Sequence, residues 1–223
     1  MQTQGKESQG SMTPAEALEL LREGNHRFRK NLKANRNLLD QVEATRGGQW
    51  PFAVVLSCID SRTSIELTFD QGLGDVFSAR IAGNFVNEDI LGSMEFACKV
   101  AGAKLVLVLG HSHCGAVKGA CDGVRMGNLT AVMEKLEPAV KATEQPTDAS
   151  ERTSANPDFV QSVAVQNVHR TVEEIRGRSE VLRDLEASGA IAMVGGMYDV
   201  ETGVVEFHPS TSPALATASE SAV

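Results

Sequence analysis

The sequence has few basic residues and no basic cluster: 21 Lys and Arg stand against 29 Asp and Glu, which gives a formal net charge of −8. Proteins that bind nucleic acid carry a basic surface that meets the phosphates, so nucleic acid is not an expected partner. No apolar run approaches the roughly 20 residues of a membrane span, and the polar residues 1–11 lack the apolar core of a signal peptide. We therefore expect a cytoplasmic protein without membrane contact.

The sequence also lacks any internal boundary that would divide it into parts, and 223 residues suffice for one domain with a sizeable core. We expect a flexible N-terminal segment over residues 1–12 and a single domain over residues 13–208. Residues 209–223 are rich in Ser, Thr and Ala, a composition that predicts a disordered tail.

Short apolar runs without polar alternation cover residues 51–57 and 104–110, as expected for parallel strands that are buried on both faces. Residues 190–195 and 204–208 predict two further strands, the last of them antiparallel at the edge of the sheet. Helical periodicity marks residues 89–100, 116–125, 128–140, 157–176 and 181–188. The pattern predicts an α/β fold: a single domain with a mostly parallel central sheet flanked by helices.

An N-terminal helix is expected to begin after Thr13, because Thr13 and Glu16 form a capping box and Pro14 suits the first helical position. This helix carries an apolar stripe formed by Leu18, Leu21 and Phe28. The stripe packs either on its own domain or on a partner, and the sequence alone does not choose between them.

Three candidate metal ligands follow the ends of two predicted strands. Cys58 comes directly after the first buried run, and His111 and Cys114 come just after the second. Ligands of open α/β sheets bind beyond the carboxyl ends of the strands, so neighbouring strands would bring these side chains together. Two thiolates and one imidazole are the ligands of a zinc site with one open position, the arrangement of catalytic rather than structural zinc.

Asp60 and Arg62 add chemistry that a purely structural zinc site does not need. The carboxylate of Asp60 would accept a hydrogen bond from a zinc-bound hydroxide and orient its lone pair toward an electrophilic carbon. Arg62 would form a bidentate pair with Asp60, which keeps the carboxylate ionised and turned away from the metal.

Three blocks of sequence, Cys58-x-Asp60-x-Arg62, residues 77–84 and residues 110–115, resemble the signature motifs of the β-class carbonic anhydrases in order and spacing. The similarity extends roughly from residue 14 to residue 207. It implies a zinc enzyme, a carbonate dehydratase, that reversibly hydrates carbon dioxide to bicarbonate and a proton by a zinc-bound hydroxide. It further implies an N-terminal helical arm that embraces a partner subunit, in a homodimer or a dimer of dimers.

The resemblance also implies a substrate pocket beside the zinc. Gln49 matches a glutamine whose amide hydrogen-bonds the substrate, and Phe77 and Phe96 match residues that line the cavity. Gly83 is expected to allow close approach of the backbone near the metal. Two alternatives stay open: Phe96 is ordinary helix core, or Gln49 is a solvated turn residue.

Relatives of this family differ in regulation. By resemblance, Asp60 becomes a fourth zinc ligand when Arg62 releases it, which would close the site. In the bicarbonate-switched branch a tryptophan near the first zinc cysteine helps to build a second bicarbonate pocket with an arginine. Here Val55 takes the place of the tryptophan while Arg80 matches the arginine, so we expect the open form as the default state.

Two alternative functions are compatible with these motifs: a carbonyl sulfide or carbon disulfide hydrolase on the same fold, and a non-enzymatic zinc-binding module. The second has no use for Asp60 and Arg62, so their presence favours an enzyme. Of the remaining candidates, Cys98 is expected to be a small buried side chain, and Cys121 is not expected to serve as a spare ligand. His113 is expected either to move protons or to pack against another subunit.

Overall fold

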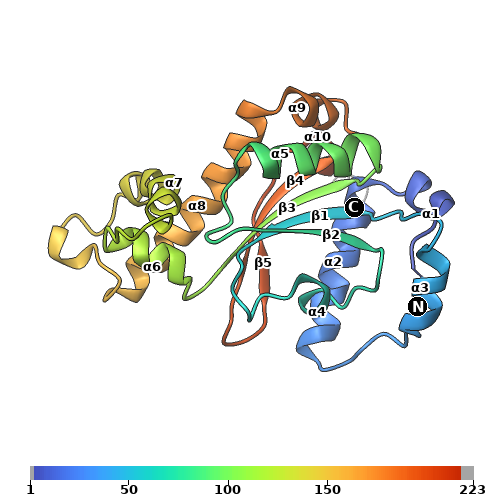
Figure 1. Cartoon of the computed structure of the whole chain (residues 1–223), viewed down its shortest axis with the longest axis horizontal. Helices are drawn as coiled ribbons and strands as arrows, with labels where there is room; N and C mark the ends of the chain where they lie inside the picture. Colours follow the sequence, from blue (N-terminus) through green and yellow to red (C-terminus); the bar gives the residue numbers. More distant parts are fainter. Residues whose placement is uncertain (1–2, 217–223) are drawn as a thin grey trace.

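The computed structural model describes residues 3–216, and a five-stranded sheet forms its centre (Figure 1). The strands are β1 (Ala53–Ser57), β2 (Val76–Arg80), β3 (Leu105–His111), β4 (Ala192–Tyr198) and β5 (Val205–Phe207). They lie in the order β2-β1-β3-β4-β5; all neighbours are parallel except β4 and β5, which are antiparallel. The predicted fold class is confirmed, including the antiparallel edge strand.

Helices connect and cover these strands. They are α1 (Lys6–Ser11), α2 (Pro14–Arg29), α3 (Leu38–Thr45), α4 (Ile65–Thr68), α5 (Glu88–Glu95), α6 (Gly115–Cys121), α7 (Leu129–Ala142), α8 (Pro157–Arg178), α9 (Glu180–Ala187) and α10 (Pro213–Ala216). A π-helical turn, η1 (Phe96–Val100), continues α5, and a short 3₁₀ turn, η2 (Ala149–Glu151), precedes α8. Among the described helices, none is both long enough and apolar enough to cross a membrane.

Alternate residues of the central strands face two separate cores, which is why β1 and β3 contain no polar alternation. Val54 and Leu56 belong to the core beneath α5, α8 and α9, whereas Ala53 and Val55 face the core beneath α2 and α4. Figure 1 shows these helices on opposite sides of the sheet. Both strands are therefore fixed in position, and so are the residues that follow them.

The expected capping box opens α2. The N–H of Glu16 donates to Thr13 Oγ1 at 3.2 Å, and the N–H of Thr13 donates to Glu16 Oε2 at 2.8 Å. The apolar stripe packs on its own domain, because Leu21 is fully buried against the sheet while Phe28 is 36% exposed. The sequence had left this choice open.

We expected flexible segments over residues 1–12 and 209–223. The parts of both segments that the structure describes contain helices and buried side chains. Within residues 1–12, α1 contains the buried side chain of Gln9, whose Nε2 donates to the carbonyls of Pro51 and Ala101 at 2.7 Å each. Within the expected tail, Ser212 is fully buried, and its Oγ accepts from the N–H of Met193 at 2.9 Å. Hydrogen bonds to backbone groups of distant segments explain both results, and composition does not reveal such bonds. Residues 1–2 and 217–223 lie outside the described residues.

Candidate metal centre

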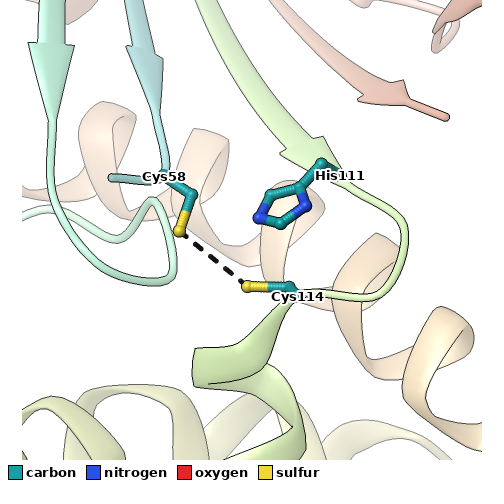
Figure 2. A group of neighbouring side chains, drawn as sticks. All are labelled: Cys58, His111 and Cys114. Atoms are coloured by element: carbon teal, nitrogen blue, oxygen red, sulfur yellow. Dashed lines mark hydrogen bonds between the residues drawn. The ribbon is translucent and has the colours of Figure 1, made fainter. Parts of the chain in front are cut away.

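The cluster of candidate ligands lies at the topological switch point of the sheet. The strand that follows β1 in sequence, β2, pairs with one side of β1, and the next strand, β3, pairs with the other side. Such a switch point is the usual ligand site of α/β sheets. Cys58 directly follows β1, His111 is the last residue of β3, and Cys114 caps α6. The three ligand atoms lie within 4.8 Å of one another, and all three residues are buried (Figure 2).

The spacing and chemistry of these atoms fit a zinc ion. The two sulfur atoms are 4.0 Å apart, close to the separation of about 3.8 Å that two 2.3 Å bonds make at a tetrahedral angle. His111 Nδ1 lies 2.9 Å from the carbonyl of Ser112, which can only accept, so this nitrogen carries the proton and Nε2 keeps a free lone pair. His111 Nε2 is buried without a hydrogen-bond partner among residues 3–216. A metal ion would supply the missing partner.

The two thiols do not share negative charge equally. The hydrogen bond with Cys114 outweighs burial and lowers the pKa of Cys58, and contacts with His111 and the N–H of Gly83 act in the same direction. The contact with Cys58, together with burial, raises the pKa of Cys114. Loss of a proton from this pair leaves a thiolate, the form of cysteine that binds a metal.

Asp60 and Arg62 form the expected bidentate pair next to the cluster. The guanidinium donates from Nε to Asp60 Oδ1 at 2.9 Å and from Nη2 to Oδ2 at 2.8 Å, and the Arg62 N–H adds a bond to Oδ1 at 3.0 Å. These hydrogen bonds from Arg62 hold the pKa of Asp60 well below its usual range. Asp60 Oδ2 lies 4.0 Å from His111 Nε2, so an ionised carboxylate stands beside the three ligands.

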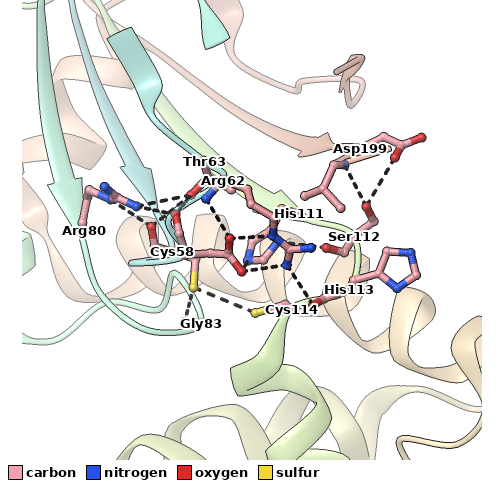
Figure 3. Close-up of polar contacts among 12 residues, drawn as sticks. Cys58, Arg62, Thr63, Arg80, Gly83, His111, Ser112, His113, Cys114 and Asp199 are labelled. Carbon is pink, nitrogen blue, oxygen red and sulfur yellow. Dashed lines mark hydrogen bonds and ion pairs between the residues drawn. The ribbon is translucent and has the colours of Figure 1, made fainter. Parts of the chain in front are cut away.

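Arg80 supports the backbone that carries these groups. Its Nε donates to the carbonyl of Cys58 at 3.0 Å (Figure 3), and its Nη2 donates to the carbonyl of Asp60 at 2.7 Å. The hydroxyl of Thr63 donates to the same Asp60 carbonyl at 2.9 Å. The family resemblance connects Arg80 only with a second bicarbonate pocket. Val55, at the position of the tryptophan of that pocket, is fully buried within the sheet.

A second set of contacts ties the loop of His111 and Cys114 to the turn between β4 and β5. Ser112 Oγ donates to Asp199 Oδ1 at 3.4 Å, and His113 Nε2 lies 2.9 Å from Glu201 Oε1. His113 adopts the left-handed conformation with a φ of 56°. Asp199 and Glu201 are not predicted as site residues by the sequence, because the only local signal there is that of a turn.

Of the expected pocket residues, only Gly83 lies at the cluster, where its N–H donates to Cys58 Sγ at 3.3 Å. Phe77 and Phe96 meet edge to face, with ring centroids 6.3 Å apart, and line a cavity of about 590 Å³ between β2 and α5. None of the three ligand residues lines that cavity. Phe96 is 52% exposed, so it is not helix core either.

Gln49 is exposed and precedes the amino end of β1, whereas Cys58 follows the carboxyl end. The carbonyls of Pro51 and Ala101 both accept a hydrogen bond from Gln9 Nε2, which holds this segment near the amino ends of the strands. Pro51 and Cys58 are seven positions apart along an extended segment, a span of roughly 23 Å. A glutamine side chain cannot cross that distance, so Gln49 does not reach the cluster of its own chain.

The other two cysteines stand apart from the ligand cluster. Cys98 is a buried residue of η1, and burial raises the pKa of its thiol to about 12, which agrees with its expected role as a small core residue. Cys121 is half-buried at the end of α6, and burial raises its pKa to about 11. All four cysteines are free thiols.

Fold and site together define an α/β protein with a Cys₂His cluster that could hold a metal ion and an ionised carboxylate beside it. The sequence model of the carbonic anhydrase family matches residues 53–205. Carbonic anhydrase 2 of Mycobacterium tuberculosis is 35% identical over 196 residues, which cover 85% of this chain and 90% of that protein. The carbonic anhydrase of Mycolicibacterium smegmatis is 33% identical over 200 residues, covering 86% and 92% of the two chains.

Solved structures show the same fold. The β-carbonic anhydrase CafA of Aspergillus fumigatus aligns with a TM-score of 0.68 at 24% identity, over 93% of this chain and 97% of that chain. The β-carbonic anhydrase CcaA aligns with a TM-score of 0.67 at 22% identity, over 89% and 90%. This chain belongs to the β-carbonic anhydrase family, whose members are enzymes classed as carbonate dehydratases.

Proposed function

We propose that this protein reversibly hydrates carbon dioxide to bicarbonate and a proton at a zinc ion held by Cys58, His111 and Cys114. The observation that carries the proposal is the position of the ionised Asp60 carboxylate, 4.0 Å from His111 Nε2 and beside three buried ligand atoms. A zinc site without catalytic function gains nothing from such a carboxylate.

Bound zinc would supply a Lewis acid that brings the pKa of water near neutral, so that a nucleophile for carbon dioxide is available at neutral pH. Asp60 accepts a hydrogen bond at Oδ2 from the attacking oxygen and orients its lone pair toward the carbon. Arg62 holds the Asp60 carboxylate ionised and turned toward its own guanidinium. When this pair breaks, Asp60 is close enough to the ligand cluster to serve as a fourth ligand and close the site.

A second copy of the chain completes the active site, in a homodimer or a dimer of dimers. Gln49 cannot reach the ligand cluster of its own chain, so it acts at a metal site only if that site belongs to another copy. Large apolar side chains stand exposed for such a contact, namely Ile59 (62%), Phe96 (52%) and Val100 (72%). A similar solved structure, from Sordaria macrospora, is described as a tetrameric β-carbonic anhydrase; it is 25% identical, with a TM-score of 0.63 over 73% of this chain and 82% of that chain.

Thiolate ligands also require a reducing compartment, and this requirement supports a cytoplasmic location. The four free cysteines are compatible with it.

The test measures carbon dioxide hydration and carbonyl sulfide hydrolysis side by side, with zinc determined on the same samples. We expect one zinc per chain and hydration as the faster reaction. Cys58→Ala and His111→Ala should lose both metal and activity, whereas the control Cys98→Ala, which removes a buried cysteine outside the cluster, should keep both. Full zinc content in either ligand variant would refute the ligand assignment, and faster carbonyl sulfide hydrolysis would refute the substrate.

A further inference from the structure

Gly83 presents its N–H to the metal-ligand sulfur from a tight turn. The N–H of Asn84 donates to the carbonyl of Ile81 at 2.9 Å, which closes a four-residue turn just after β2. Gly83 is the third residue of this turn and has a φ of 80°, the value of a type II turn. Its N–H takes no part in closing the turn and donates to Cys58 Sγ at 3.3 Å.

Two helices hold this turn in place. A Cβ on Gly83 would lie 2.7 Å from Cδ1 of Leu136 in α7, so α7 packs directly on the glycine. From the other side, Nδ2 of Asn167 in α8 donates to the Gly83 carbonyl at 2.8 Å in a buried hydrogen bond. Asn167 is 84 residues from Gly83 in sequence, so this bond joins the turn to a helix that forms much later in the chain.

The buried amide of Asn167 lies in an apolar core, where a polar side chain lowers the stability of the fold unless it is hydrogen-bonded. It is 4% exposed, and its neighbours Val163, Ala164 and Val168 belong to the apolar core on the same side of the sheet. A buried amide lowers stability unless its hydrogen bonds are made. An apolar residue would pack at this position without burying a polar group. The property that asparagine adds is the hydrogen bond to the Gly83 carbonyl.

A hydrogen bond to a thiolate lowers the energy of the sulfur lone pairs and so reduces the charge that the sulfur donates to a metal. We propose that Asn167 is a positioning residue: through the Gly83 carbonyl it keeps the Gly83 N–H on Cys58 Sγ and so sets the charge that this sulfur delivers to the metal. The inference rests on the proposed zinc site. It assigns a role in that site to a residue of α8 that touches no ligand.

The test uses the full-length protein loaded with Co²⁺ in place of zinc, because the sulfur-to-cobalt charge-transfer band reports the energy of the thiolate electrons. Asn167→Leu should shift this band to longer wavelength, because the Cys58 sulfur then donates more charge to the metal. Asn167→Ala, which adds no bulk to the core, should shift the band in the same direction and serves if the leucine variant does not fold.

Asn25→Leu is the matched control. Asn25 is also a buried asparagine whose Nδ2 donates to backbone carbonyls, those of Thr68 and Gly203 at 3.2 and 2.9 Å, but it lies outside the metal cluster. This variant should lose stability and leave the band unchanged. An unchanged band in both Asn167 variants, or an equal shift in Asn25→Leu, would overturn the role of Asn167. A wild-type protein without a sulfur-to-cobalt band would overturn the metal site itself, and this inference with it.

Discussion

At the scale of the residue, the chemistry of the site depends on how the hydrogen-bonding capacity of Asp60 is used. A carboxylate offers about four lone-pair directions, and Arg62 occupies three of them with two guanidinium bonds and one backbone bond. Oδ2, which faces His111, receives only one of these bonds. The remaining lone pair of Oδ2 would be available to a substrate oxygen at the proposed metal.

Asp60→Asn should keep the metal and lower turnover by about 100-fold or more, the usual contribution of a positioned proton acceptor. The amide replaces one acceptor oxygen by a donor, so it cannot accept from Arg62 at both atoms and from the reacting oxygen as well. Metal content and hydration rate on the same sample measure both effects. Asp122→Asn removes the same charge from an exposed position away from the cluster and should have wild-type activity. Near wild-type activity of Asp60→Asn would disprove the orienting role.

Arg62→Ala should lower activity for a different reason. Without its two guanidinium bonds, the Asp60 carboxylate is free to turn to the metal and take the open position as a fourth ligand. X-ray absorption should then find one additional oxygen ligand at about 2.0–2.2 Å, and Arg62→Lys, which keeps the charge, should show it less. A crystal structure of Arg62→Ala with Asp60 still turned away from the metal would contradict this explanation.

At the scale of the element, the position of the site depends on how closely helices approach the sheet and its loops. Gly24 lets α2 lie against the chain that follows α4, because a Cβ at this position would be 1.8 Å from the carbonyl oxygen of Phe69. Asn25, the next residue of α2, bridges the same region through the carbonyls of Thr68 and Gly203. The packing of α2 on this face of the sheet therefore includes a close contact between backbones that a Cβ at position 24 would disrupt.

Gly24→Ala should lower the free energy of unfolding by about 3 kcal/mol, because a backbone carbonyl cannot move aside as a flexible side chain can. Gly177→Ala is the control: Gly177 lies in α8, where a Cβ would meet no neighbouring atom within 4 Å, so alanine should raise stability by up to about 1 kcal/mol. Urea unfolding of both variants measures the two effects. Equal stability of Gly24→Ala and wild type would show that α2 shifts without cost.

At the scale of the whole molecule, one chain does not assemble every residue that the family resemblance assigns to the pocket. The proposed metal ligands lie at the carboxyl ends of the strands, and Gln49 lies at the amino ends. A symmetric dimer brings unlike parts of two copies together, because residue i of one copy meets residue j of the other in both directions. Activity should therefore depend on association.

Hybrid dimers test this dependence directly. A dimer that combines one Gln49→Ala chain with one His111→Ala chain should show about half the wild-type activity, because it holds one intact site if Gln49 is supplied by the partner. The two chains carry different affinity tags so that hybrids are purified away from both homodimers. If Gln49 acts within its own chain, every site of the hybrid is defective, and its activity should not exceed that of the Gln49→Ala homodimer.

The sequence alone predicted the parallel sheet, the ends of β1 and β3 and the cluster of Cys58, His111 and Cys114. These features depend on local signals: continuous apolar runs for strands buried on both faces, and ligand residues placed directly after them. The edge strand β2 was not predicted as a strand, because with a neighbour on one side only it is partly exposed and has no continuous apolar run.

Only the tertiary structure decided which distant residues support the site. Asn167 binds the Gly83 carbonyl, and Asp199 and Glu201 hold the loop of the second and third ligands, in pairs separated by more than 80 residues. It also showed that Gln49 and Phe96 lie away from the cluster of their own chain. Contacts between residues so far apart in sequence depend on how the helices pack on the sheet, and local sequence patterns do not predict that packing.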